Sequence, residues 1–194
     1  MRIYFVRHGQ SDANIRNMIA GQYDSKLTEQ GRKDALKARA ILKNIPFDRV
    51  YSSDLSRARI TQEIALSCED VIITELIREI DVGNKLEGKT YEKCEEEFGT
   101  VYVSDRAEFN FQPYGGENYR MLEKRVVEFL QKVVNDGGEC VAAFSHGGFI
   151  NAVLGFVLGC HVTTKKALSD NCGVSVFEYS NNTWKLVKWN MTAQ

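Results

Sequence analysis

Long apolar runs and an excess of charge of either sign are both missing from this sequence of 194 residues. The longest nearly apolar stretch, residues 147–160, is shorter than the roughly 20 residues that a helix needs to cross a bilayer. Lysine and arginine number 25 against 26 acidic residues, so the net charge of −1 gives no reason to expect binding to nucleic acid or to a membrane. No signal-peptide pattern precedes the first apolar run. We therefore expect a cytoplasmic protein, and the sequence does not define its oligomeric state.

Paired cysteines and known nucleotide-binding loops are also absent. The five cysteines are odd in number and form no C-x-x-C pair, so neither a disulfide framework nor a structural zinc site is indicated. No Walker loop, G-x-G-x-x-G or G-x-S-x-G motif occurs, which argues against a nucleotide-binding loop and against a serine nucleophile elbow. We expect no metal and no cofactor.

What the sequence does contain is an alternation of strand-like and helix-like segments. Apolar runs predict strands at 3–6, 48–52, 71–74 and 140–144, and helical periodicity predicts helices at about 28–43, 54–67, 117–135 and 148–158. Thr28 is the expected N-cap of the first helix, and Ser53 or Asp54 that of the second. The Asn181-Asn182 pair predicts a final hairpin. We predict an α/β protein, a three-layer α/β/α sandwich whose mostly parallel sheet has an antiparallel C-terminal element, in a single domain spanning 1–194.

Two segments depart from this regularity. Residues 15–26 are expected to form a polar loop. Residues 83–116 contain clustered aromatic side chains and several glycines, with short helices predicted at 90–98 and 103–109. Because a long irregular segment in a compact domain is usually a lid or binding loop, we expect 83–116 to be a lid that determines specificity.

Two histidines occur in the same local order, which is a buried strand, His-Gly and then a helix. They are His8 and His146. If both strands are central in one parallel sheet, both histidines reach the carboxyl edge, where α/β proteins bind ligands. Arg7 precedes His8, and guanidinium groups bind phosphoryl oxygens bidentately. Since a neutral imidazole can attack phosphorus as a covalent nucleophile, this pattern indicates a site for a phosphoryl group.

Seven blocks of the chain, in order, resemble the histidine phosphatase superfamily in its phosphoglycerate mutase-like branch. They are 6–11 (VRHGQS), 27–31 (LTEQG), 52–58 (SSDLSRA), 76–83 (LIREIDVG), 86–88 (LEG), 113–117 (PYGGE) and 145–148 (SHGG). Together they cover nearly the whole chain, which looks like the small phosphatases of this branch, such as α-ribazole phosphatase and the broad-specificity phosphatases. Gln10, Leu86 and Asn118 depart from the Glu, Trp and Ser that many members carry.

The resemblance implies a role for each matching polar residue. His8 would be the nucleophile that becomes phosphohistidine, and Glu79 would donate a proton to the leaving oxygen. His146 would complete the catalytic set. The phosphoryl oxygens would be held by His146 together with Arg7, Asn14 and Arg57. Gln10, Ala20, Gly21 and Gly147 are the other residues expected to form the substrate-binding site.

Three functions are compatible with these observations. The leading expectation is a metal-independent phosphatase that hydrolyses a small-molecule phosphate monoester. The alternatives are a 2,3-bisphosphoglycerate-dependent phosphoglycerate mutase and a non-enzymatic phospho-ligand binder. A binder needs the arginines but not Glu79, so the sequence favours an enzyme. A mutase needs an enclosing lid and extra cations, whereas the predicted lid is compact and scatters Lys85, Lys89, Lys93 and Arg106 among glutamates. The aromatic residues of 102–114 suggest an organic leaving group.

Overall fold

The computed structural model describes residues 1–163 and 166–193. Its strands are β1 (Arg2–Arg7), β2 (Arg49–Ser53), β3 (Val71–Thr74), β4 (Cys140–Ser145), β5 (Val174–Ser180) and β6 (Thr183–Met191). Its α-helices are α1 (Asp12–Ile15), α2 (Glu29–Leu42), α3 (Ser56–Ala65), α4 (Tyr91–Ala107), α5 (Tyr119–Asp136) and α6 (Gly147–Leu158). Two 3₁₀-helices lie at Glu75–Ile77 and Gln112–Tyr114.

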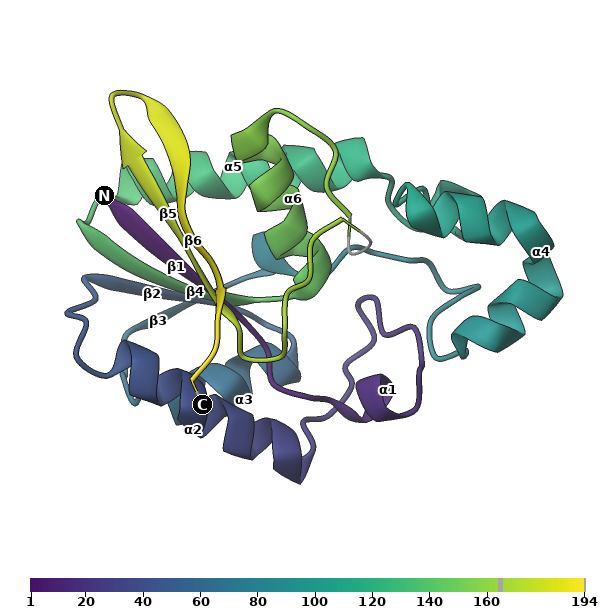
Figure 1. The fold of residues 1–194 in the computed structure, drawn as a ribbon, viewed down its shortest axis with the longest axis horizontal. Helices are drawn as coiled ribbons and strands as arrows, with labels where there is room; N and C mark the ends of the chain where they lie inside the picture. The colour runs from purple at the N-terminus through teal and green to yellow at the C-terminus, as the bar shows by residue number, and fades with distance from the viewer. Residues whose placement is uncertain (164–165, 194) are drawn as a thin grey trace.

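The strands of the described chain form one mixed sheet in the order β3-β2-β4-β1-β5-β6. The first four of these run parallel, while β5 is antiparallel to β1 and β6 is antiparallel to β5. Helices α2 and α3 cover one face of the sheet, and α5 and α6 cover the other (Figure 1). The predicted three-layer α/β/α architecture, with its antiparallel C-terminal element, is confirmed.

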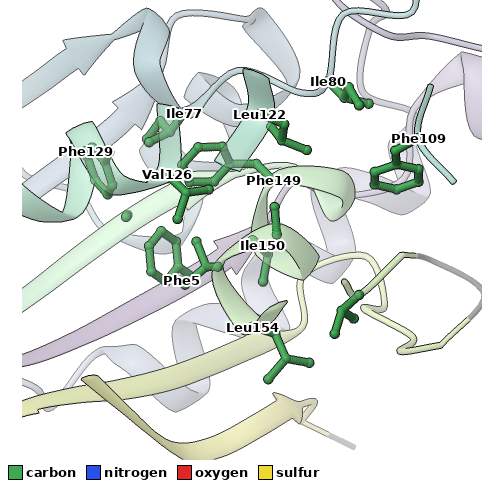
Figure 2. Packing of buried hydrophobic residues seen from close by; sticks show 14 of the residues in the cluster. Phe5, Ile77, Ile80, Phe109, Leu122, Val126, Phe129, Phe149, Ile150 and Leu154 are labelled. Atoms are coloured by element: carbon green, nitrogen blue, oxygen red, sulfur yellow. The ribbon is translucent and has the colours of Figure 1, made fainter. Parts of the chain in front are cut away.

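Each face of β1 belongs to a different hydrophobic cluster, because successive residues of a strand point to opposite sides of the sheet. Phe5 packs against Phe129 of α5 and Phe149 of α6, with ring centroids 6.0 and 6.3 Å away, and Figure 2 shows these three rings side by side. Val6 belongs to the cluster on the opposite face, with Ala35 and other residues of α2. A strand buried on both faces holds its carboxyl end in a fixed place.

The two central strands β1 and β4 end at the same level of the sheet. Arg7 is paired with Ser145 across the parallel ladder, and the His8 N–H donates to the Ser145 carbonyl at 3.0 Å. The chain then leaves the sheet at His8 on one strand and at His146 on the other. This register brings the two histidines together, with their ring centroids 5.1 Å apart.

Helix α3 begins differently from the prediction. Neither Ser53 nor Asp54 is its N-cap, because the helix starts at Ser56 and the N-cap position is Leu55. Ser53 Oγ accepts from the Leu55 N–H at 3.3 Å, and Asp24, from the loop after α1, accepts from the Ser56 N–H at 2.7 Å. A carboxylate that is distant in sequence therefore satisfies a backbone donor at this helix end.

One segment differs from expectation and another agrees with it. The predicted polar loop 15–26 is preceded by the short helix α1, whose N-cap Ser11 forms a capping box with Asn14. Two short helices are predicted within 83–116, and α4, which projects away from the sheet (Figure 1), consists of two helical parts joined by a kink at Gly99, where φ is 66°. Glycine adopts this left-handed conformation without steric cost, so the chain can bend there while the flanking turns remain helical.

Candidate active site

A cavity of about 290 Å³ lies at the carboxyl ends of β1 and β4. Eight of the ten residues predicted for the site line it, namely Arg7, His8, Asn14, Ala20, Gly21, Arg57, Glu79 and Gly147. The other two, Gln10 and His146, are not among its lining residues. The sequence blocks that contain these residues are far apart along the chain, and the sheet edge brings them to one place.

His8 is held as a neutral imidazole with one nitrogen free. Its Nδ1 lies 2.7 Å from the Gly9 carbonyl oxygen, and since a carbonyl only accepts, Nδ1 carries the proton. Nε2 then has its lone pair available. Burial, followed by the positive charges of Arg57 and Arg7, holds the pKa of His8 well below its usual range. An unprotonated Nε2 is what a nucleophilic histidine requires.

Two arginines flank His8, of which Arg57 is buried and Arg7 is half-buried. Arg57 is 1% exposed, and its two terminal nitrogens donate to the carbonyl oxygens of Tyr23 and Gly21, each at 2.8 Å. Burial lowers the pKa of Arg57 to about 10, with Arg7 acting in the same direction, and the group still carries its charge at neutral pH. Arg7 donates through Nη1 to the Ser169 carbonyl. Both guanidinium groups are thus fixed by backbone carbonyls, which neutralise none of their charge.

Several buried nitrogen atoms at the site make no hydrogen bond with any described residue. They are Arg7 Nε, Arg57 Nε and His146 Nδ1. A buried donor without a partner costs roughly 1–3 kcal/mol, more when it is charged. Because the arginine donors belong to two positive groups at one cavity, a bound anion with several oxygens would satisfy them.

Glu79 lines the cavity, and the N-terminal end of α6 holds its carboxylate. Its Oε1 accepts from the Ile80 N–H at 2.9 Å, and its Oε2 accepts from the Gly148 N–H, in the first turn of α6, at 3.1 Å. A side chain at Gly148 is not tolerated without movement, because an added Cβ would lie 2.3 Å from Glu79 Oε1. The carboxylate also interacts electrostatically with Arg7 and Arg57.

The backbone behind Glu79 is held by an ion pair. Arg125 on α5 donates to the Glu79 carbonyl at 3.1 Å and to Glu117 Oε2 at 2.7 Å. Glu117 in turn accepts from the Asp81 N–H at 2.9 Å. The sequence predicted no partner for Glu117, and Arg125 was not recognised as part of the site, since an arginine on an amphipathic helix is usually a surface residue.

His146 is completely buried and lies behind His8 rather than on the cavity wall. It is the N-cap residue of α6, and its Nε2 lies 3.0 Å from Ser53 Oγ. Burial and the charge of Arg57 hold the pKa of His146 well below its usual range. The structure therefore places a second neutral imidazole against the first.

Asn14 and Gln10 have different positions, although both were predicted to contact substrate. Asn14 lines the cavity, and its Oδ1 accepts from the Ser11 N–H at 2.9 Å, which leaves the amide nitrogen free to donate. For Gln10, which does not line the cavity, contact with substrate stays a prediction. Its Oε1 accepts from the Thr28 hydroxyl at 2.9 Å, so this side chain ties the loop after β1 to the start of α2.

Sequence reasoning missed the wall formed by residues 167–169. Ser169 supplies the carbonyl that holds Arg7, and its own hydroxyl is buried, lines the cavity and has no partner in the described chain. Asn151 and Trp189 fix this wall by donating to the Ala167 and Leu168 carbonyls, at 3.0 and 2.7 Å. Most of these hydrogen bonds use main-chain carbonyl groups of the wall, and main-chain groups leave no signature in the sequence.

The described residues contain no group of three or more His, Cys, Asp or Glu placed to hold a metal ion. Within the same residues, no helix has both the length and the apolar character needed to cross a membrane. Among these residues, the charged groups that line the cavity are three arginines on three different elements, Arg7, Arg57 and Arg106, and the carboxylate of Glu79.

A neutral histidine and two arginines meet at one sheet edge, an arrangement suited to a phosphoryl group, and comparison with known proteins identifies the family. The family model described as histidine phosphatase superfamily (branch 1) matches residues 3–192. The chain belongs to this superfamily.

Individual relatives carry more than one activity in their names. A 2,3-bisphosphoglycerate-dependent phosphoglycerate mutase from Parvibaculum lavamentivorans is 32% identical over 163 residues, which are 78% of this chain and 77% of the relative. A probable phosphoglycerate mutase GpmB from Salmonella paratyphi A is 28% identical over 97% of this chain and 90% of its own length. The solved structure of a mycobacterial glucosyl-3-phosphoglycerate phosphatase in complex with VO3 has a TM-score of 0.87 and 27% identity, covering 97% of this chain and 98% of that one.

Proposed function

We propose that this protein is a metal-independent phosphatase that hydrolyses a small-molecule phosphate monoester through a phosphohistidine intermediate on His8. The observation that carries the proposal is the combination of a neutral His8, with Nε2 free, and the unpartnered Nε donors of Arg7 and Arg57 at one cavity. The pair of arginines offers charge for a phosphoryl group, and the free nitrogen offers an electron pair to its phosphorus.

The proposed reaction has two steps. In the first, the Nε2 lone pair of His8 forms a bond to phosphorus while the ester P–O bond breaks, and Glu79 gives a proton to the departing oxygen. In the second, water attacks phosphorus, the P–N bond breaks and returns its electron pair to Nε2, and Glu79 accepts the proton of the water. The arginines hold the phosphoryl oxygens in both steps, with Asn14 assisting. His146, packed against His8, holds the nucleophile in place.

The cavity volume favours a small substrate. At about 290 Å³ it lies just below the usual range of roughly 300–1,000 Å³ for ligand pockets. We propose that the partner is a small phosphate ester rather than a nucleic acid, that no cofactor is needed, and that the protein acts in the cytoplasm. We also propose that 83–116 acts as its lid, since α4 contributes part of the wall.

A second candidate function is the mutase. It is favoured by the relative from Parvibaculum lavamentivorans and by one cation of α4, Arg106, which lines the cavity. The lysines of this segment do not line the cavity. In the described chain, the rest of the cavity wall offers no second cluster of positive charge. We rank hydrolysis first, because a mutase must hold a second anionic group while keeping water from the phosphohistidine.

The two candidates differ in what they release. Purified protein is given 3-phosphoglycerate with catalytic 2,3-bisphosphoglycerate, and both free phosphate and 2-phosphoglycerate are followed. We expect free phosphate to dominate. Rapid interconversion with little free phosphate would promote the mutase, and binding without either product would promote the phospho-ligand binder.

Independence from metals is tested on the same preparation. Hydrolysis of p-nitrophenyl phosphate should survive dialysis against EDTA. Full loss of activity that a divalent ion restores would contradict the proposal.

The role of Glu79 is tested by the leaving group. Glu79→Gln should slow hydrolysis of alkyl phosphates by about 10²–10⁴-fold, the usual range for general acid catalysis. p-Nitrophenyl phosphate should be slowed much less, because its leaving group barely needs a proton. Equal slowing of both substrates would show that Glu79 only positions its neighbours.

A further inference from the structure

A segment of main chain beside the cavity holds Arg7. The Ser169 carbonyl accepts from Arg7 Nη1. The Gly173 carbonyl accepts from the Arg7 N–H, and the Cys172 N–H donates to the Arg7 carbonyl, each at 3.1 Å. Residues 169–173 therefore bind both the backbone of Arg7 and one end of its guanidinium, beside the carboxyl end of β1 (Figure 1). The direction of the guanidinium depends on what holds this segment in turn.

Asn190, near the end of β6, binds the same peptide group as Arg7. Its Oδ1 accepts from the Asp170 N–H at 2.8 Å, and its Nδ2 donates to Asp170 Oδ2 at 2.7 Å. The Asp170 N–H and the Ser169 carbonyl belong to one planar peptide group, whose two polar ends point in opposite directions. Asn190 therefore holds one end of this group while Arg7 binds the other.

The path of β6 brings the Asn190 amide to this peptide group. The register of the β5–β6 ladder shifts between Val174 and Val176, where β6 has one residue more than β5. Such an extra residue is a β-bulge, which turns a side chain in a new direction and is common beside active sites. Asn190 lies within it at a φ of 50°, in the left-handed region that asparagine enters more readily than most residues. Its N–H donates to Ser175 Oγ at 3.0 Å, which fixes the bulge to β5.

The other anchors of this wall act earlier in the chain. Asn151 and Trp189 bind carbonyls that precede the Ser169 carbonyl. They hold the wall, whereas the peptide group that meets the guanidinium is bound by Asn190. The fit around this amide is close, because a Cβ added at Gly173 would lie 2.0 Å from Asn190 Oδ1.

We propose that Asn190 is a positioning residue for Arg7: from the bulge of β6 it fixes the Ser169–Asp170 peptide group, and that group aims the guanidinium into the cavity. This inference rests on the proposed phosphatase function, in which Arg7 holds the phosphoryl oxygens. It gives β6 a part in phosphate binding although no residue of that strand lines the cavity. Binding of inorganic phosphate is measured as well as turnover, so that the two proposals can fail separately.

Asn190→Gly removes the amide and leaves the left-handed backbone free of steric cost. We expect the Kd for inorganic phosphate, measured by calorimetry, to rise about three- to tenfold, because a loosened Arg7 loses part of a charge-assisted hydrogen bond. KM for p-nitrophenyl phosphate should rise by the same factor. The change in kcat should stay below about twofold, since Arg7 binds the phosphoryl oxygens before the reaction as well as during it. A Kd equal to that of the unmodified protein overturns the proposal.

Asn181→Gly is the matched control. Asn181 lies in the turn between β5 and β6, at the opposite end of β6 from Asn190, and has the same φ of 50°. The substitution therefore makes the same change of side chain and backbone on an exposed residue outside the cavity. Its Kd and KM should equal those of the unmodified protein. An equal rise in both variants would show a general effect of loosening the hairpin and would overturn the role of Asn190.

Combination with the arginines shows whether Asn190 acts through Arg7. In Arg7→Gln protein, Asn190→Gly should change the Kd for phosphate by less than about twofold, because the guanidinium that it positions is gone. In Arg57→Gln protein the full rise of about three- to tenfold should remain, since Arg57 is held by the carbonyls of Tyr23 and Gly21. Equal effects in the two backgrounds overturn the proposal.

An exchange of the two side chains tests the contact itself. Asn190→Asp sets two carboxylates against each other and should weaken phosphate binding at least as much as Asn190→Gly. Adding Asp170→Asn restores a donor opposite an acceptor and should return the Kd to within about twofold of the unmodified value. Asp170→Asn alone keeps a hydrogen bond to Asn190 and should also stay within about twofold. A double variant as weak as Asn190→Asp, or a large change in Asp170→Asn alone, overturns the proposal even if Asn190→Gly does not fold.

The unmodified protein separates the two proposals. If it binds phosphate but hydrolyses no ester, the phosphatase proposal fails and the Kd values alone decide the role of Asn190. If it binds no phosphate, both proposals fail.

Discussion

Strands β1 and β4 lie side by side, and each ends in a histidine followed by glycine, yet the two histidines have different surroundings. His8 lines the cavity, and its Nδ1 is bound to a backbone carbonyl. His146 has no exposed surface, caps α6 and lies against Ser53. The same short motif thus produces one residue that can meet a ligand and one that supports it. What differs is the chain that follows. After His8 it turns into a loop, whereas after His146 it enters a helix at once.

The largest expected difference is in turnover. His8→Ala should reduce phosphate release by about 10⁴-fold or more and abolish acid-labile phosphate on the protein, because no other group takes over as nucleophile. His146→Ala should cost about 10²–10³-fold and still trap phosphate on the protein, since the nucleophile remains. The readout is rapid quench with labelled substrate. If both variants lost trapped phosphate to the same extent, the proposed difference between His8 as nucleophile and His146 as its support would be wrong.

The glycines that follow the histidines should respond differently to alanine. A Cβ at Gly9 would lie 2.4 Å from the Gly31 carbonyl oxygen, which belongs to the backbone and moves little. Gly9→Ala should therefore lower the free energy of unfolding by about 3 kcal/mol, as overpacking does.

At Gly147 the nearest atom to such a Cβ is Arg7 Nε, at 3.3 Å, the end of a side chain. Gly147→Ala should leave stability within about 1 kcal/mol and raise KM about three- to tenfold by shifting Arg7. Urea unfolding and steady-state kinetics on the two variants check both statements, and a fully folded Gly9→Ala protein of normal stability would contradict the first.

In one respect the two histidines should behave alike. Both have a lowered pKa in the folded protein, so below the ordinary histidine pKa the unfolded chain binds protons that the folded chain does not. The contribution of the two histidines to the free energy of unfolding should be fully present above about pH 6.5. Below that pH the free energy of unfolding should fall by up to about 1.4 kcal/mol per pH unit for each histidine, until the pKa of that histidine in the folded protein is reached. Urea unfolding at pH 7.5, 6.5 and 5.5 measures this. His8→Gln and His146→Gln should each reduce the slope by about one proton.

The smallest effect concerns the partner of His146. Ser53→Ala removes the hydroxyl that lies 3.0 Å from His146 Nε2 and should cost about 1 kcal/mol of stability, with a few-fold loss in kcat. Ser52→Ala on the same strand is the control, because the Ser52 hydroxyl donates to the Ser53 carbonyl at 2.9 Å and makes no hydrogen bond with a histidine among the described residues. A larger loss of activity in the control would show that His146 is not oriented by Ser53.

Periodicity predicted the strands and most helices because each of these elements buries one side chain in every two or every three to four, which is visible in the sequence. The meeting of His8 and His146 followed from the expectation of a parallel sheet. The start of α3 could not be predicted from local sequence, since Asp24, 32 residues away, accepts the hydrogen bond from the Ser56 N–H. The wall at Ser169 was missed for a different reason. Its interaction with Arg7 uses a main-chain carbonyl, which every residue has. Gln10 was placed by resemblance alone, and a local bond to Thr28 determines its actual position.

The position of β1 between β4 and β5 has a consequence for how the protein is made. Its first partner begins at Cys140 and its second at Val174. At a translation rate of roughly 5–20 residues per second, about 7–28 s pass between the synthesis of β1 and that of its first partner, β4. Throughout that time the apolar residues of β1 have no neighbouring strand to pair with, and contacts between such distant segments form slowly. A nascent chain that stalls before β4 is therefore left with an unpaired apolar strand, which exposes it to aggregation and to chaperones.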